Sequence, residues 1–203
     1  MVGFCDILVI AALHCSLKLA GDHMCHLGCR WSGRYVWGVA YNGLSVHSAS
    51  CQLPDATPDL SLASRSVVTS TSENAQILHR LSRKFAVEYA AGARYKILCT
   101  ADQLVTSYVL SRSNTFKWDT CGPHAILLAK GGGIVDLHQA VDAAGRGWPI
   151  DKVAVECQLR YNQANDGYSA EAVECWGNNG GVIAYRDVDV LADILAALTS
   201  SID

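Results

Sequence analysis

The sequence predicts a layered α-β-α domain of the α/β class, preceded by a β-hairpin. Short apolar runs alternate with segments of helical periodicity from residue 65 to residue 203, a pattern typical of helices that cover both faces of a sheet. Upstream, the aromatic and β-branched residues 34–41 and the alternating residues 44–48 flank an Asn-Gly pair, which indicates two antiparallel strands. For the layered domain we expect a mostly parallel or mixed sheet of about five strands.

Composition narrows the class of partner. Half of the 203 residues are hydrophobic and 17% are charged, so the chain is not of the disordered class. The formal net charge of −3 provides no basic field, and we therefore expect no nucleic-acid partner. An anionic substrate would need local positive charge, either from metal ions or from a few placed Lys and Arg side chains.

Cysteine usage indicates a reducing compartment. The nine cysteines are odd in number and irregularly spaced, which favours free thiols over a disulfide framework and predicts a cytoplasmic location. They are Cys5, Cys15, Cys25, Cys29, Cys51, Cys99, Cys121, Cys157 and Cys175.

Residues 1–30 remain unassigned. The apolar run at 7–13 is too short to span a bilayer. A signal peptide would need a basic segment before that run, and Asp6 stands there instead. We therefore expect a buried or loosely attached segment and no membrane span.

A cluster of possible zinc ligands follows. His23, Cys25, His26 and Cys29 are residue types that bind zinc, but structural zinc sites usually draw a second pair from a separate segment. No second pair follows at suitable spacing, so a zinc-binding or interaction module is the least favoured of the functions considered.

The hairpin and the connection after it occupy residues 31–64. Residues 34–41 are rich in aromatic and β-branched side chains, and Asn42-Gly43 is a strong signal for a two-residue turn. We assign 31–50 to this hairpin, 51–64 to a linker rich in Ser, Asp and Pro, and 65–203 to the C-terminal α/β domain.

The first strand of that domain, at 65–69, leads into a turn rich in hydroxyl groups. Ser72 or Thr71 could cap the helix predicted over 74–84. A strand that ends at such a helix N-terminus could bind an anion, although a plain helix cap explains the same residues.

A turn of small residues enters the next helix. Gly92 permits close approach of the backbone to a ligand, and Lys96 could place a positive charge on a phosphate oxygen. The alternative for Lys96 is a solvated helix face. A buried strand over 104–110 then follows.

The segment 114–137 contains the strongest candidate residue. Asp119 can cap a short buried helix with Pro123 in its first turn, and three glycines at 131–133 end that helix before a strand. Asp119 could instead hold a divalent cation beside a helix N-terminus that favours phosphate.

The remaining chain completes the layered domain. We predict a helix at 138–144, a loop over most of 151–171, and a Gly-Gly turn into a final strand within 174–186. Asp187 can cap a last helix whose apolar stripe faces the core.

Three strings between 116 and 136 resemble a known signature. They are Phe-Lys-Trp-Asp-Thr-Cys (116–121), His-Ala-Ile-Leu (124–127) and Gly-Gly-Gly-Ile-Val-Asp (131–136). Together they resemble the C-terminal signature of the inositol monophosphatase superfamily, and within it the branch that acts on inositol polyphosphates in phosphatidylinositol signalling. The branch that acts on 3′,5′-bisphosphate nucleotides is the alternative.

The resemblance implies Mg²⁺-dependent, lithium-sensitive removal of the 1-phosphate from inositol 1,4-bisphosphate and inositol 1,3,4-trisphosphate. It implies that Asp119 is a metal ligand. It also implies that one group of residues lines the phosphate and inositol pocket, with Asn74 standing where a basic side chain is expected. That group comprises Ser72, Asn74, Gly92, Ala93 and Lys96.

The acidic motifs that the family carries upstream of the hairpin are missing. The sequence contains no Asp-Pro-x-Asp-x-Ser/Thr string and no Glu-Glu pair. The resemblance extends from about Arg30 to the C-terminus, so we expect a truncated member that hydrolyses inositol phosphates far below family rates. The alternative is an inactive fragment with a weak phosphate-binding cleft. In either case the chain would be a monomer, or would associate non-specifically through an exposed sheet edge.

Overall fold

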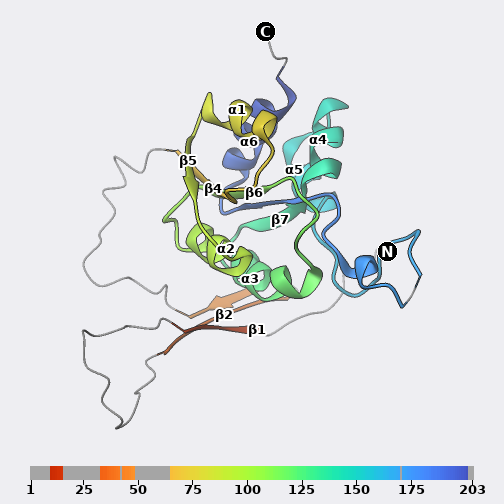
Figure 1. Ribbon diagram of the computed structural model, residues 1–203. Coiled ribbons are helices and arrows are strands. Elements are labelled where there is room, and N and C mark those ends of the chain that lie inside the picture. The colour runs from red at the N-terminus through yellow and green to blue at the C-terminus, as the bar shows by residue number, and fades with distance from the viewer. Residues whose placement is uncertain (1–9, 16–32, 42, 49–64, 170, 201–203) are drawn as a thin grey trace, which may run out of the picture.

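The computed structural model describes residues 10–15, 33–41, 43–48, 65–169 and 171–200. Five strands form the main sheet in the order β5-β4-β6-β8-β7 (Figure 1). Their bounds are β4 Ser66–Thr69, β5 Ala86–Tyr89, β6 Ser107–Leu110, β7 Gly133–Asp136 and β8 Val182–Tyr185. The expected five-stranded mixed sheet is confirmed.

Strand direction places most loop ends at one edge of this sheet. β4 pairs in parallel with β5 and with β6, whereas β8 runs antiparallel to both β6 and β7. The carboxyl ends of β4, β5, β6 and β7 therefore meet at the same edge. In open α/β sheets, ligands bind at this edge.

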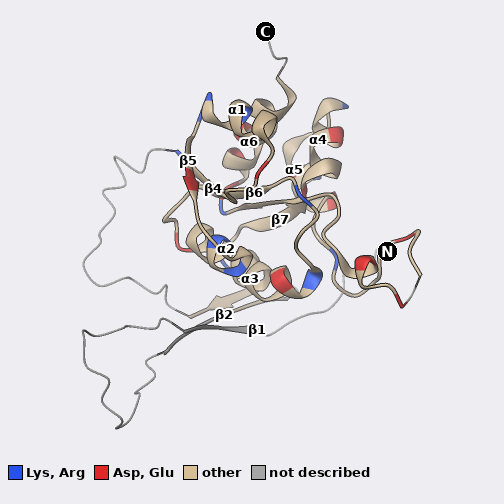
Figure 2. Cartoon of the chain, in the orientation of Figure 1, with Lys and Arg blue, Asp and Glu red and all other residues tan. Residues whose placement is uncertain are grey.

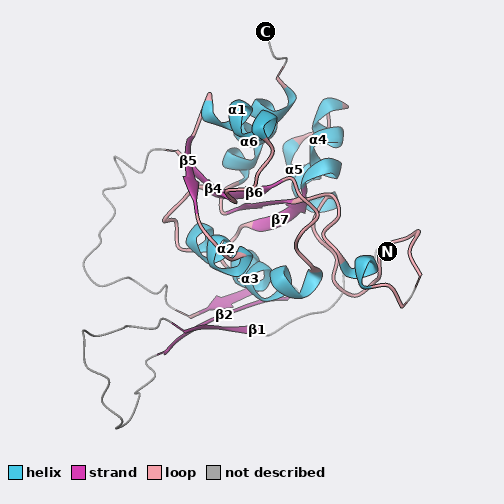
Figure 3. Ribbon diagram, in the orientation of Figure 1, coloured by secondary structure: helices cyan, strands magenta, loops and turns pink. Residues whose placement is uncertain are grey.

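Helices cover both faces of the sheet (Figures 1 and 3). On one face lie α1 Ala75–Ser82, α4 Leu137–Gly145, α5 Ile150–Glu156 and α6 Val188–Thr199. On the other face lie α2 Ala93–Ala101 and α3 Lys117–Ala129. The predicted α-β-α layering is confirmed. Among the described residues, none of the helices combines the length and apolar character needed to cross a bilayer.

Each face of the sheet has its own buried core. Val109 and Ile183 pack with α1, α4, α5 and α6, whereas their strand neighbours Tyr108 and Ala184 pack with α2 and α3. Successive residues of a strand point to opposite faces. Strands buried on both faces therefore read as continuous apolar runs, as in Val182–Tyr185.

A second sheet forms a fourth layer beyond α3. It consists of β1 Ile10–Cys15, β2 Gly33–Tyr41 and β3 Leu44–His47, all antiparallel. β2 approaches α3 so closely that a Cβ atom on Gly38 would lie 2.8 Å from the Cα atom of Ile126. The hydroxyl of Ser45 also donates to the carbonyl oxygen of Ala129 at 3.1 Å.

The predicted hairpin is present, but its surroundings differ from expectation. Gly43 has a positive φ of 80°, and Tyr41 faces Leu44 across the two-residue turn. The exposed sheet edge that was expected beside the hairpin is not found at β2, because β1 pairs with that strand. β3 is exposed along its whole length, and no described strand pairs with its outer edge.

Two elements depart from the sequence prediction. β5 lies in a segment for which no strand was expected, and α5 lies in a segment assigned to loop. The strand predicted over 104–110 begins only at Ser107, because the residues before it form the turn that ends α2. A short 3₁₀ helix, Val173–Trp176, precedes the turn into β8.

Two predictions lie outside the described residues, namely the possible zinc ligands at 23–29 and the linker at 51–64. The cysteines whose side chains are described, Cys99, Cys121, Cys157 and Cys175, are free thiols.

Candidate functional site

The candidate site lies at the carboxyl ends of β4 and β6. α1, which follows β4, lies on one face of the sheet, and α3, which follows β6, lies on the other face. Connections that diverge in this way leave a crevice between two neighbouring parallel strands. Segments that follow β4, β5 and β6 converge there.

Glu73 joins two of these segments. Its side chain is 6% exposed, and it accepts the backbone N–H groups of Ser111 at 2.8 Å and of Asn74 at 2.6 Å. The hydroxyl of Ser111 also donates to it, and the Thr69 hydroxyl, which donates to the Val109 carbonyl oxygen at 2.8 Å, lies 3.4 Å from Oε2. A carboxylate that accepts several hydrogen bonds is held in one orientation. Sequence reasoning did not single out this residue.

Lys96 extends from α2 into the same crevice region. It is only 4% exposed, and its ammonium lies 4.6 Å from the centroid of the Tyr108 ring. Burial lowers the pKa of Lys96, and the charge of Glu73 partly opposes that effect. The alternative of a solvated helix face is therefore wrong. The ammonium makes no hydrogen bond with any described residue, which leaves its donors available to a ligand.

Tyr108 lies within the field of both carboxylates of the site. Burial raises the pKa of Tyr108, and the charges of Glu73 and Asp119 raise it further. Its phenol therefore stays neutral at physiological pH.

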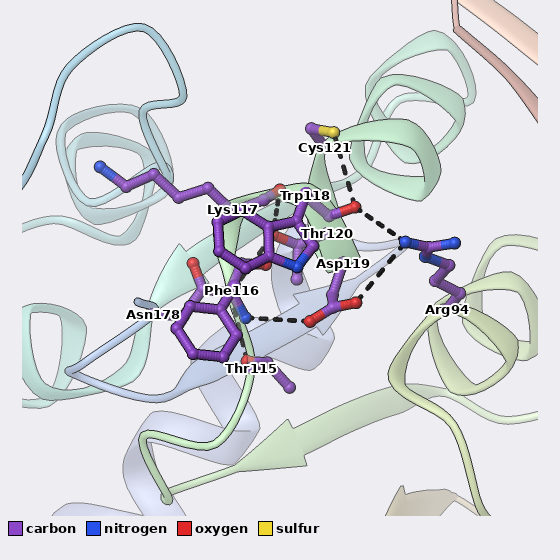
Figure 4. Close-up of polar contacts among 9 residues, drawn as sticks. All are labelled: Arg94, Thr115, Phe116, Lys117, Trp118, Asp119, Thr120, Cys121 and Asn178. Carbon is purple, nitrogen blue, oxygen red and sulfur yellow. Dashed lines mark hydrogen bonds and ion pairs between the residues drawn. The ribbon is translucent and has the colours of Figure 1, made fainter. Parts of the chain in front are cut away.

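One prediction placed Asp119 at the N-cap of α3, and this prediction is wrong. Phe116 occupies the N-cap position, and Asp119 is the third residue of the helix, where its Oδ2 accepts the Phe116 backbone N–H at 3.1 Å (Figure 4). This is one half of a capping box. The rings of Phe116 and Trp118 stack at a centroid distance of 4.6 Å and fix the same turn.

Pro123 also differs from expectation. Because α3 begins at Lys117, Pro123 lies in its second turn rather than its first. It has no N–H to offer the carbonyl of Asp119 four residues earlier. Gly131, with φ of 88°, follows the C-terminal end of the helix.

The residues after β4 do not have the roles that the sequence predicted. The cap of α1 is Asn74, whose side-chain oxygen accepts the Gln76 N–H at 2.8 Å, and neither Ser72 nor Thr71. Ser72 is exposed, and its hydroxyl lies 3.1 Å from that of Ser70. A neutral, engaged Asn74 offers no positive charge to a phosphate.

The start of α2 is open to a ligand. Gly92 occupies the N-cap position with φ of 79° and provides no side-chain cap, so the N–H groups of the first turn, beginning at Ala93, are not capped by a side chain. Such groups favour an anion. Figure 2 shows basic residues on α2 beside the charged start of α3.

Arg94 links the starts of α2 and α3, and sequence reasoning did not single it out. Its Nη2 lies 3.6 Å from Oδ1 of Asp119 and donates to the carbonyl oxygen of Trp118 at 3.3 Å (Figure 4). Arg94 is well exposed, since its side chain has 64% relative accessibility.

The donor set that the described residues provide does not fit a Mg²⁺ site. Asp119 is engaged through both carboxylate oxygens, and Glu73 is committed to Ser111 and Asn74. Among the described residues, no group of three or more His, Cys, Asp or Glu side chains could hold a metal ion. Mg²⁺ is usually positioned by more than one protein oxygen in an octahedral arrangement.

Two cavities lie on other parts of the molecule. A cavity of about 520 Å³ lies between α1, α4 and α6, and one of about 680 Å³ lies beside the loop that precedes β8. Asn74 and Ser111 line the first cavity, but neither cavity is lined by Lys96 or Asp119. Lys96 and Asp119 therefore lie outside both cavities.

Comparison with known proteins identifies the class. Residues 7–176 match the sequence model of the inositol monophosphatase family. The chain belongs to that family. The matched region begins upstream of Arg30, where the resemblance was expected to start, and it includes β1.

Named relatives refine this comparison. The chain is 37% identical to inositol polyphosphate 1-phosphatase of Mus musculus over 183 residues, which is 85% of this chain and 44% of the relative. The Homo sapiens protein of the same name is 37% identical over 85% of this chain and 45% of its own length. A 3′(2′),5′-bisphosphate nucleotidase 1 of Dictyostelium discoideum is 30% identical over 53% of this chain. The chain spans less than half the length of these relatives.

Solved structures give weaker matches. An IMPase of Thermotoga maritima aligns with a TM-score of 0.46 and 12% identity, covering 81% of this chain and 50% of its own. Inositol monophosphatase from Anabaena (Nostoc) aligns with a TM-score of 0.49 and 14% identity, covering 81% and 53%. The family assignment rests on the sequence match.

Proposed function

We propose that this chain provides the substrate-binding part of an inositol polyphosphate 1-phosphatase. The reaction would release the 1-phosphate from inositol 1,4-bisphosphate and inositol 1,3,4-trisphosphate. The observation that carries the proposal is Lys96, which is 4% exposed and whose ammonium lies over the Tyr108 ring, in the field of Glu73, without a hydrogen-bond acceptor among the described residues. A buried cation of this kind is stabilised by a bound anion.

The roles of the other residues follow from their positions. The backbone N–H groups at Gly92 and Ala93 would approach a phosphate or an inositol hydroxyl at the start of α2. The exposed hydroxyl of Ser72 would contact the substrate from the loop after β4. Asn74 would contact it only after giving up its cap of α1.

Asp119 is proposed as one Mg²⁺ ligand, as the family resemblance implies. Among the described residues, no group of three or more His, Cys, Asp or Glu side chains completes a metal site around it. We expect the purified chain to bind inositol phosphates and to hydrolyse them far below family rates.

Sequence similarity favours inositol phosphates over nucleotides. The two relatives named for inositol polyphosphate cover 85% of this chain, whereas the Dictyostelium nucleotidase covers 53%. A 3′,5′-bisphosphate nucleotide is therefore the second candidate substrate.

Isothermal titration of the purified chain with inositol 1,4-bisphosphate in Mg²⁺ buffer tests the proposal. Lys96→Met should weaken binding about tenfold or more, since hydrogen bonds to charged groups are worth about 1.5–3 kcal/mol. Lys84→Met is the matched control, because Lys84 is exposed in the turn after α1 and should leave binding unchanged. Equal affinity in the wild type and Lys96→Met would refute the proposed role.

The same sample tests activity. Release of phosphate with Mg²⁺ present should be very slow. Turnover at the rate of a full-length relative, abolished by Asp119→Asn, would show that the chain assembles a complete catalytic site.

A further inference from the structure

A polar cavity lies apart from the candidate site. Its volume is about 680 Å³, within the range of small-molecule sites, and none of Ser72, Lys96 or Asp119 lines it. It lies between the first turn of α3, the start of α4 and the loop that precedes β8. Amide side chains are frequent in its walls, and each amide can both donate and accept hydrogen bonds. They belong to Gln139, Gln158, Gln163, Asn165, Asn178 and Asn179.

Asn178 offers an unused acceptor in this cavity. The residue is 3% exposed, and its Nδ2 donates to the hydroxyl oxygens of Thr115 at 3.1 Å and Thr120 at 3.3 Å (Figure 4). Its Oδ1 is buried, and no group in the part of the chain that the structure describes donates to it. Because an unsatisfied buried acceptor costs free energy, a ligand that donates to this oxygen is favoured.

Lys117 offers unused donors to the same cavity. The residue is 8% exposed, its Nζ donates to the Gln163 carbonyl oxygen at 2.5 Å, and it lies 5.7 Å from the centroid of the Trp176 ring. None of the ion pairs among the described residues includes it. An ammonium carries three donors, so Lys117 can donate to a ligand oxygen and keep its bond to Gln163.

The two side chains reach the cavity from adjoining segments. Phe116 and Gly177 form an antiparallel bridge, so Lys117 and Asn178 each lie one residue from that bridge. Figure 4 shows the Lys117 side chain extending away from Asp119. The cavity is therefore separate from the residues proposed to contact phosphate.

Charges of both signs line the cavity. Lys117 and Arg160 provide positive charge, whereas Asp136, Glu156 and Asp166 provide negative charge. This balance gives no advantage to an anion. A neutral ligand with several hydroxyls fits better, because one hydroxyl can donate to the unsatisfied amide oxygen while another accepts from the ammonium.

We propose that this cavity binds a small neutral polyol, with one hydroxyl donating to Asn178 Oδ1 and another accepting from Lys117 Nζ. The C–H face of a cyclic polyol would lie on the ring of Tyr168, an exposed residue that lines the cavity. The proposal is independent of the proposed function, since it uses none of the residues assigned to phosphate.

Titration of the ¹⁵N-labelled full chain with myo-inositol, followed by NMR, tests the proposal. The backbone amide signals of residues 177–180 should shift and saturate, with a Kd on the order of 1 mM. Asn178→Ala, Lys117→Met and Tyr168→Ala should each weaken binding about fivefold or more. Asn114→Ala is the matched control, because Asn114 is exposed and does not line the cavity.

Two further arms separate this cavity from the candidate site. Lys96→Met should leave the shifts at residues 177–180 unchanged, because Lys96 lies outside the cavity. Inorganic phosphate at the same concentration should not shift these signals. An equal response to phosphate would overturn the assignment of a neutral ligand, and loss of the shifts in Lys96→Met would place the polyol at the candidate site instead.

The cavity variants decide the remaining outcomes. Absence of a saturable shift at residues 177–180 would show that the cavity holds only water. Equal affinity in the wild type, Lys117→Met and Tyr168→Ala would also overturn the proposal. Thermal unfolding of each variant, measured without ligand, shows whether it keeps the fold. Should Asn178→Ala lose the fold, the exposed position of Tyr168 still leaves a variant that decides.

Discussion

Glu73 and Ser111 join the loops that follow two neighbouring parallel strands. The Ser111 backbone N–H donates to Glu73 Oε2 at 2.8 Å, and the Ser111 hydroxyl donates to Oε1. Glu73 lies four residues after β4, and Ser111 directly follows β6. The contact holds together the two loops that border the crevice. There the Lys96 ammonium lies over the Tyr108 ring.

Replacing Glu73 by Gln should therefore destabilise the fold. The side-chain amide would place donors where the carboxylate now accepts, and it would leave buried N–H and hydroxyl groups without partners. We expect the free energy of unfolding to fall by about 1–3 kcal/mol, measured by urea denaturation. Glu171→Gln, at an exposed position, should change it by less than about 0.5 kcal/mol. Equal stability of the two variants would contradict a structural role for Glu73.

Because Lys96 is buried, phosphate binding should weaken at alkaline pH. Burial lowers the pKa of Lys96 below its ordinary value of 10.5. As pH rises through that lowered value, the ammonium loses its proton and affinity should fall. Over the same window the unfolded chain retains the proton longer than the folded chain, so stability should rise with pH.

Comparison of the wild type with Lys96→Met checks both trends. Phosphate affinity and unfolding free energy are measured from about pH 7 up to the ordinary lysine pKa of 10.5. Both trends should be reduced in Lys96→Met, and the variant should be no less stable than the wild type at neutral pH, because a buried charge has been removed. An identical pH dependence in both proteins would exclude Lys96 as the titrating group.

Close contact between the small sheet and α3 gives a prediction about Gly38. A Cβ atom there would lie 2.8 Å from the Cα atom of Ile126 and 2.9 Å from the Cβ atom of Ala129. Gly38→Val should force β2 away from α3 and cost about 1–3 kcal/mol. Gly145→Ala is the control, because a Cβ atom at Gly145 meets nothing within 4 Å. A fully stable Gly38→Val would show that the small sheet does not pack on α3 in solution.

Much of the layered domain was predictable because its signals are local. Strands buried on both faces appear as apolar runs, and Asp187 caps α6 as predicted by accepting the Asp189 N–H. β5 was missed because its four residues are exposed or half-buried and show no alternation. α5 was missed because it is short and buries only Val153.

The helix starts show why the site was only partly predictable. Several residues between Ser70 and Asn74 are good caps, and the sequence does not choose among them, whereas the structure uses Asn74. Glu73 depends on Ser111, which is 38 residues away, and the Arg94–Asp119 contact spans two helices. Contacts at such distances in the sequence carry no periodic signal, so the roles of Glu73 and Arg94 emerge only from the fold.

His124 lies in the core and gives a prediction about how stability depends on pH. The residue is 2% exposed, its Nδ1 lies 2.8 Å from the Tyr161 hydroxyl, and its Nε2 lies 2.7 Å from Oε1 of Gln158. The amide nitrogen of Gln158 donates to the Ala154 carbonyl, so its Oε1 is the acceptor and His124 Nε2 donates to it, while Nδ1 accepts from the tyrosine. The Ile134 N–H, which lies 3.1 Å from Nε2 and 3.2 Å from Oε1, then donates to the amide oxygen. This arrangement holds the ring neutral.

Burial lowers the pKa of His124 to about 4 from its ordinary 6.5, and the hydrogen bond to Gln158 opposes the shift. Between these values the unfolded chain holds a proton that the folded chain lacks, so stability should fall as pH drops from about 6.5 to about 4. The loss attributable to this group is about 3 kcal/mol, at about 1.4 kcal/mol per pKa unit. Urea denaturation at several pH values measures the slope. That slope should flatten in His124→Gln and persist in His138→Gln, an exposed position. Because the slope is compared and not the absolute stability, lower stability of His124→Gln does not affect the result, whereas an unchanged slope would assign the acid sensitivity to other groups.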